Sequence, residues 1–239
     1  MVVNADGMEY RELNETLRKS PKTCTVRNCL GQRFIAAGMS DRRIRLEGIP
    51  GNALGAYLNG ASVEVFGNAQ DAVGDTMNAG EIVIHGNVGD AAGYAMRGGA
   101  IFVKGNAGYR AGIHMKEYRE KVPLIVIGGR TGSFLGEYQA GGKIIVLGLH
   151  TDGKPIVGNF PCTGMHGGKV YLRSDGSEIC FPDQVHAKPA TAQDLKEIHA
   201  ALEEFAKRFG YSLRELTNAP FTVVTPDSKN PYKQLYVAN

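Results

Sequence analysis

The sequence predicts a mainly β fold, a single-stranded right-handed parallel β-helix with short flanking α-helices. Three observations lead to this prediction. Glycine occupies 32 of 239 positions and clusters in the middle of the chain, well above the usual share of about 7%. The glycines of this region recur with a fixed period, and a short alternating apolar stretch precedes each repeat of the pattern.

The period is nineteen residues, and two glycine ladders share it. Such a unit is too short for a strand, a crossover helix and a return strand. Each unit therefore predicts one coil of a stack, with parallel strands about 4.8 Å apart and the right-handed sense of parallel crossovers. Glycine suits the corners because they need positive φ or close backbone approach, and the asparagines predict a stacked amide ladder. The corner residues are Gly48, Gly67, Gly86 and Gly105, then Gly55, Gly74, Gly93 and Gly112, with Asn68, Asn87 and Asn106 after ladder glycines.

The strands are predicted where apolar residues stand two and four positions before a ladder glycine, as do Ile82 and Ile84. After an inserted four residues, the pattern is expected to resume with Leu124 and Val126 before Gly128. The remaining side chains of these strands then point outward. They change from Glu64, His85 and Lys104 in early coils to Ile125, Ile127, Ile145 and Leu147 in late coils. The late coils therefore predict a cover, either the C-terminal segment of the chain or a partner subunit.

Three regions follow from this pattern: an N-terminal helix and lead-in over 1–30, the β-helix over 31–182, and a C-terminal helical segment and tail over 183–239 that packs on the β-helix. Thr191 and Asp194 form a capping-box-like start for one C-terminal helix. A second helix is expected to begin at Ser212, and a strand over 221–224.

Composition excludes several classes of partner. The formal charge is +3, with 27 basic residues scattered among 24 acidic ones, so neither nucleic acid nor a membrane is indicated. The chain start lacks the order of a signal peptide, and we expect a cytoplasmic protein. The four cysteines do not match a zinc spacing, so no metal site is predicted.

Catalytic motifs are weak. The stretch 124–136 imitates a dinucleotide-binding turn but lacks its glycine spacing. His150 and His166 flank an irregular insertion that contains Cys162, which we interpret as a loop for structure or docking. Asp71, Asp75 and Asp90 fall at coil corners, where aspartate commonly serves turns. No catalytic, cofactor-binding or metal-ligating residue is therefore predicted.

The repeat, with GNAQDAVGDTMNAGEIVIHGN at 67–87 and GNVGDAAGYAMRGGAIFVKGN at 86–106, resembles the GXGXG β-helix domain at the C-terminus of the glutamate synthase large subunit. The last coil at 163–168 and the tail at 221–226 extend the likeness. The resemblance implies a non-catalytic assembly subunit of a split glutamate synthase, which makes glutamate from glutamine and 2-oxoglutarate. Its implied partners are an amidotransferase subunit and an FMN-domain subunit, with FMN and an iron–sulfur cluster in those partners and no cofactor in this chain. The family's nucleophilic N-terminal cysteine has no counterpart, since the chain begins Met1, Val2, Val3.

Two alternatives stay open. The C subunit of formylmethanofuran dehydrogenase has similar coils, and a carbohydrate-acting β-helix enzyme is a third reading. Open coil ends also predict association between copies. The docking candidates are Ile125, Ile127, Ile145, Leu147, His150 and His166.

Overall fold

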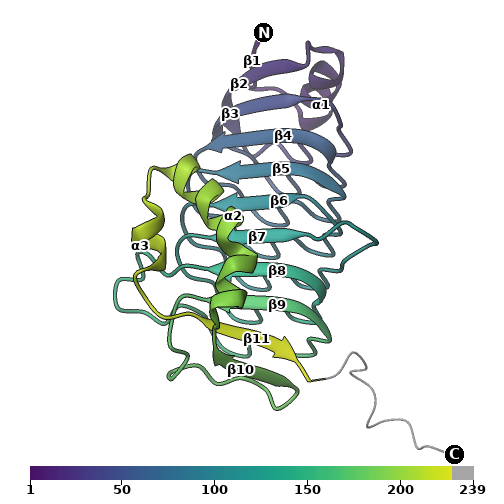
Figure 1. The fold of residues 1–239 in the computed structure, drawn as a ribbon. Helices are drawn as coiled ribbons and strands as arrows, with labels where there is room; N and C mark the ends of the chain where they lie inside the picture. The colour runs from purple at the N-terminus through teal and green to yellow at the C-terminus, as the bar shows by residue number, and fades with distance from the viewer. Residues whose placement is uncertain (228–239) are drawn as a thin grey trace, which may run out of the picture.

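The computed structural model describes residues 1–227, and its centre is a right-handed stack of parallel strands that descends from the N-terminus (Figure 1). One sheet holds all the strands of these described residues, in the order β1-β2-β3-β4-β5-β6-β7-β8-β9-β11-β10. Its parallel part comprises β1 (Val2–Asn4), β2 (Thr23–Leu30), β3 (Arg43–Ile49), β4 (Asn59–Phe66), β5 (Ala79–Ile84), β6 (Ala100–Val103), β7 (Leu124–Ile127), β8 (Ala140–Val146) and β9 (Gly167–Leu172). The predicted parallel β-helix is therefore confirmed.

Side chains at equivalent positions stack in columns inside the coils. Ile82 pairs with Val63 on one side and with Ile101 on the other. Met77, Met96 and Met115, which recur with the nineteen-residue period, are fully buried in the same core. A continuous apolar core along the axis of the stack stabilises every coil through its two neighbours.

Both ends of this core are covered. At the N-terminal end, helix α1 (Tyr10–Lys19) places Leu13 and Leu17 in the interior cluster. At the C-terminal end, β11 (Thr222–Pro226) pairs antiparallel with β9, and β10 (Val185–Pro189) pairs antiparallel with β11. The expected C-terminal strand is thus present and closes the parallel stack, whereas β10 has no counterpart in the sequence-based prediction.

Helix α2 (Ala192–Phe209) lies across the outer face of the late strands (Figure 1). The predicted capping box is present, because Thr191 and Asp194 exchange hydrogen bonds at its start. Its buried residues Ile198, Leu202 and Phe205 belong to a second core with the outward side chains of the sheet. The C-terminal segment therefore covers the late coils. The predicted second helix, α3 (Leu213–Thr217), also begins with a capping box, at Ser212.

The prediction for the outward side chains of the late coils was wrong for Ile125 and Ile127. Both are fully buried inside the coil, since Ile125 pairs with Ile101 and Ile144. The insertion after Met115 has five residues instead of four, because the next ladder glycine is Gly129. All four residues of β7 are apolar, so alternation could not fix which of them point inward.

Ile145 and Leu147 do point outward, but they are buried in the cluster that α2 completes. Helix α2 of the same chain covers both side chains, so a partner subunit cannot contact them. The prediction that Ile145 and Leu147 belong to a docking surface is therefore wrong. Within residues 1–227, no helix has the length and apolar character needed to cross a membrane.

The segment between His150 and His166 was interpreted as a loop for structure or docking, but most of it belongs to the coil stack. The backbone N–H of Phe134 donates to Asn159 O at 2.9 Å, and that of Cys162 donates to Leu135 O at 2.7 Å. These hydrogen bonds stack the second half of the segment as a regular corner on the preceding coil. Only the residues around 149–155 form an insertion relative to the regular coil.

Candidate functional site

The predicted asparagine ladder forms one continuous hydrogen-bonded column, but each side chain bonds the backbone of the next coil. Asn68 Oδ1 accepts from the N–H of Asn87 at 2.8 Å, Asn87 Oδ1 accepts from that of Asn106 at 2.8 Å, and Asn106 Oδ1 accepts from that of Arg130 at 2.9 Å. Backbone groups at an irregular corner need such partners. The asparagines therefore serve the stacking of the coils.

The two ladders require glycine for different physical reasons. A side chain at Gly86 would overlap Asn68 Oδ1 and the backbone of Gly67, so this ladder is required by close approach of adjacent coils. Gly93 has φ +71, and a Cβ there would also overlap the side chain of Ile125. These glycines of the second ladder thus combine a left-handed backbone with a crowded interior.

The predicted histidine and cysteine arrangement does not converge. His150 Nε2 lies 3.2 Å from Tyr211 Oη, beside the C-terminal helices. His166 donates from Nδ1 to Gly164 O within its own turn, at 3.0 Å. Between them in sequence, Cys162 is fully buried, and burial raises the pKa of its thiol to about 12. A thiol in this state is a poor nucleophile.

The corner aspartates serve turns. Asp71 Oδ1 accepts from the N–H of Asp90 at 2.9 Å, and Asp90 Oδ1 accepts from that of Tyr109 at 2.8 Å. Asp75 accepts from Thr76 Oγ1 at 2.8 Å. Among residues 1–227, no group of three or more His, Cys, Asp or Glu side chains is arranged to hold a metal ion.

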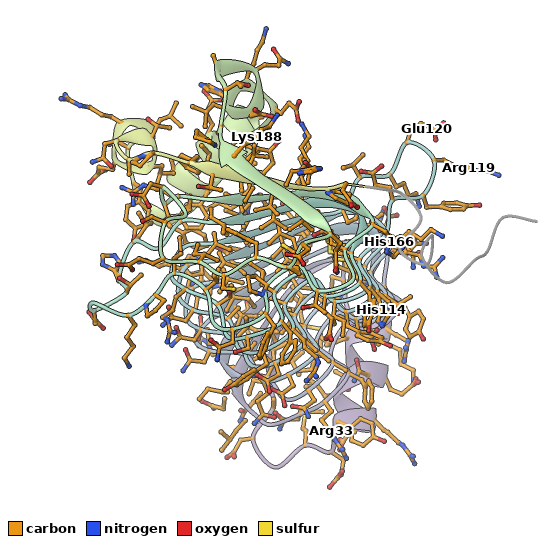
Figure 2. All side chains as sticks on the ribbon, turned by 90° about the horizontal axis from the view of Figure 1, so that it is seen from below. Arg33, His114, Arg119, Glu120, His166 and Lys188 are labelled. Atoms are coloured by element: carbon orange, nitrogen blue, oxygen red, sulfur yellow. The ribbon has the colours of Figure 1, made fainter. Side chains whose placement is uncertain are left out.

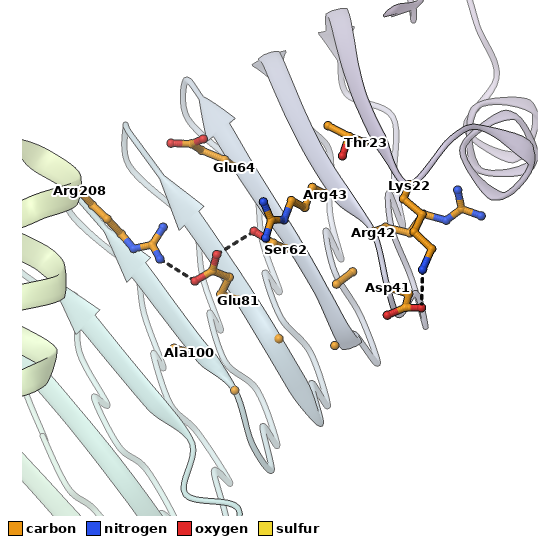
Figure 3. A pocket seen from close by; sticks show the side chains of 14 residues that line it. Lys22, Thr23, Asp41, Arg42, Arg43, Ser62, Glu64, Glu81, Ala100 and Arg208 are labelled. Carbon is orange, nitrogen blue, oxygen red and sulfur yellow. Dashed lines mark hydrogen bonds and ion pairs between the residues drawn. The ribbon is translucent and has the colours of Figure 1, made fainter. Parts of the chain in front are cut away.

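An open groove of about 940 Å³ lies on the outer face of the early strands, where α2 ends (Figure 3). Its charges largely neutralise one another. Lys22 Nζ lies 3.1 Å from Asp41 Oδ2, and Arg208 Nη2 lies 2.6 Å from Glu81 Oε2. The groove is therefore a polar surface in which these ion pairs offset most of the charge, while Arg43 forms no ion pair within residues 1–227.

The turn-bearing side of the coil stack carries an exposed aromatic column, which we define as Tyr94, His114 and Tyr138. The rings of His114 and Tyr138 are stacked with centroids 5.2 Å apart, and Tyr94 meets His114 edge-on at 6.0 Å. Beside the column, Phe134 lies 5.4 Å from Phe160. Sequence reasoning missed this column, although tyrosines outside the core positions of the repeat were its signal.

A hairpin, residues 117–122, projects from the same side of the molecule as His114 and His166 (Figure 2). Tyr118 and Lys121 exchange two backbone hydrogen bonds of 3.1 Å. Glu117 Oε1 accepts from the N–H of Gly142 at 2.9 Å, which fixes the base of the hairpin to the next coil. This hairpin contains the five-residue insertion, so its sequence signal was visible while its place beside the aromatic column was not.

The stacked coils with their glycine corners and asparagine column define a parallel β-helix domain of the glycine-repeat class. The chain belongs to the GXGXG motif family, whose model matches residues 12–226. It is similar to a protein of Methanocaldococcus jannaschii that bears the name "Uncharacterized protein MJ1350", with 46% identity over 99% of this chain and 96% of that protein.

The chain is also similar in fold to a solved structure of a multi-subunit complex. It is the formyltransferase/hydrolase complex FhcABCD from Methylorubrum extorquens, in complex with methylofuran. The TM-score is 0.61, the identity is 20%, and the match covers 91% of this chain and 84% of that chain. The likeness supports the β-helix assignment.

Proposed function

We propose that this chain is a non-catalytic assembly subunit of a multi-subunit enzyme, with its β-helix as a rigid support for catalytic partners. The observation that carries the proposal is the exposed aromatic column on the turn-bearing face, which lies outside both apolar cores of the chain. Aromatic side chains exposed in a contiguous group are typical of protein interfaces. The coil stack holds them in fixed positions, which lowers the entropy lost on docking.

Two enzymes are candidates for the assembly. The C subunit of formylmethanofuran dehydrogenase is supported by the fold similarity to a chain of the formyltransferase/hydrolase complex. Glutamate synthase is supported by the sequence resemblance in the last coil at 163–168 and in β11. In either enzyme, we expect the active site to belong to other subunits, together with the FMN and iron–sulfur cluster that the glutamate synthase resemblance implies.

The experiment isolates the chain from its native source with a tag on the chromosomal copy and identifies the subunits that co-elute. A glutamate synthase subunit will co-elute with amidotransferase and FMN-domain subunits and stimulate glutamine-dependent glutamate formation when added back. A formylmethanofuran dehydrogenase subunit will co-elute with a formyl-group enzyme instead. Recovery of the chain without any partner, or catalysis by the chain alone, would contradict the proposal.

A further inference from the structure

A second column of side chains runs beside the aromatic column, at the corner where each turn leads into a strand. The backbone N–H of Arg97 donates to Met77 O at 2.8 Å, that of Lys116 donates to Met96 O at 3.0 Å, and that of His166 donates to Gln139 O at 2.8 Å. The same hydrogen bond, made by Ala140 in the coil between Lys116 and His166, places all four residues at equivalent positions of successive coils. This corner therefore gains the cations Arg97 and Lys116 in the coil before the hairpin and in the coil that carries it, where the earlier coils have Asn59 and Asn78.

Two glycines, one in each neighbouring coil, leave room for the hairpin to pack against this corner. A Cβ at Gly98 would lie 3.2 Å from Lys121 Cβ, and a Cβ at Gly141 would lie 2.5 Å from Glu117. The coils above and below the hairpin thus lack the side chains that would lift it away. Its tip, Arg119 and Glu120, projects from the body of the molecule (Figure 2).

The charge of the corner is unbalanced. Arg97, Lys116, Arg119 and Lys121 are exposed, and within residues 1–227 none of them forms an ion pair. Glu117 is held by the backbone of Gly142. Unpaired cations on a fixed surface attract and orient an acidic partner during encounter.

The same corner exposes large aromatic surface. Tyr94 is 41% exposed, Tyr118 at the hairpin is 51% exposed and Tyr138 is 38% exposed. Tyrosine and arginine are among the residues most enriched at the positions that carry the binding energy of an interface. By contrast, the outer sheet face is closed by α2 over the late strands, and ion pairs offset most of the charge of its open part, which exposes no large aromatic cluster among the groove residues.

We propose that a partner subunit docks on this corner through a segment of acidic and apolar side chains. The docking corner consists of the aromatic column, the cations Arg97 and Lys116, His166 and the hairpin 117–122. This inference rests on the proposed function and names the surface that performs it. A protein partner is favoured over nucleic acid because Glu117 and Glu120, exposed in the hairpin, interrupt the cations and would oppose a continuous phosphate backbone.

The first test compares covalent surface labelling of tyrosine and lysine in the free chain and in the assembly purified from the native source. Labelling of Tyr94, Tyr118 and Lys121 is expected to fall sharply in the assembly, while Lys196 and Lys207 on α2 stay labelled. Protection confined to α2 or to the sheet groove would overturn the inference and leave the proposed function intact. Recovery of the unassembled chain alone would overturn both.

The second test uses charge reversal in the full chain. The double variant Arg119→Glu, Lys121→Glu is expected to weaken binding of the purified partner subunits about tenfold or more. The double variant Lys196→Glu, Lys207→Glu makes the same change of charge on α2 and is expected to bind like the natural chain. Equal binding by all three proteins overturns the inference, as does protection at the corner that nuclease treatment removes or that a second copy of this chain supplies.

Discussion

Arg208, near the end of α2, pairs with Glu81 of β5 across 127 positions of sequence, with 2.6 Å between Nη2 and Oε2. The same guanidinium lies 2.7 Å from Glu204 and 5.3 Å from the ring of Phe102. Glu81 also accepts from Ser62 Oγ at 2.8 Å. The ion pair therefore connects the C-terminal end of α2 to β5, where the outer face of the sheet changes from polar to apolar.

Replacing Glu81 by Gln is expected to lower the free energy of unfolding by about 1 kcal/mol, because both side chains are partly exposed and such pairs are weak. Urea denaturation followed by circular dichroism measures this. The control is Glu47→Gln, whose partners Arg27 and Arg45 lie on the uncovered early strands, where the loss is expected to be smaller. Equal losses in the two variants would argue against a tie between α2 and the sheet.

The start of α2 is held by a second polar cluster that depends on pH. Glu197 accepts from Lys169 Nζ at 2.8 Å and from Tyr171 Oη at 3.0 Å. The hydrogen bond from Lys169 holds the pKa of Glu197 below its usual range. Because the folded-state pKa lies below the unfolded value, this stabilisation is present above about pH 4 and is lost as the pH falls through the folded-state pKa.

Glu197→Gln is therefore expected to flatten the loss of stability between about pH 5 and pH 3. Urea midpoints measured at intervals across this range give the comparison. Glu178→Gln, at an exposed position of the loop before β10, is the control and should follow the natural curve. An unchanged acid limb in Glu197→Gln would show that other carboxylates govern the pH dependence.

The coil repeat could be predicted from sequence because equivalent positions of every coil have the same steric surroundings and therefore require the same residue type. Gly86 is required where two backbones approach, and Met96 is required inside the coil, so both recur with the period. The capping box at Thr191 could likewise be predicted, since a cap is local in sequence.

Two features could not be predicted from sequence, because they depend on contacts between residues distant in sequence or on segments without apolar–polar alternation. The strand Leu124–Ile127 is apolar on both faces, since α2 covers its outer side, so the inward residues could not be distinguished. The docking corner brings together Tyr94, His114 and Tyr138 from three coils. Its members are exposed and follow no hydrophobic period, so only the stacked coils reveal it.

Substituting glycines with left-handed backbones should separate two contributions to the loss of stability: backbone strain and overlap of the new side chain with the interior. Gly93 and Gly210 both have left-handed backbones, with φ +71 and φ +76, but only at Gly93 would a Cβ overlap a neighbour, Ile125. Gly210→Ala is expected to cost about 1 kcal/mol from the backbone alone. Gly93→Ala is expected to cost about 1–3 kcal/mol more, because the interior is overpacked.

Thermal and urea unfolding of the two variants separate the costs. The natural chain gives the reference, and an unchanged urea dependence confirms that the unfolded states are comparable. Equal losses in Gly93→Ala and Gly210→Ala would mean that the side chain of Ile125 moves aside freely.

The four cysteines are expected to differ strongly in reactivity. Cys24, Cys29 and Cys162 are buried, whereas Cys180 is exposed. Burial raises the pKa of the Cys29 thiol to about 11 and that of Cys162 to about 12, so both stay protonated near neutral pH. Because the thiolate is the reactive form, a thiol reagent should modify Cys180 quickly and the other three only as fast as the chain unfolds. Mass spectrometry of a time course with iodoacetamide measures this, and Cys180→Ser should abolish the fast phase. Rapid modification of Cys162 in the folded chain would contradict the closed last coil, because this thiol can be reached only if the corner at Phe160–Thr163 opens.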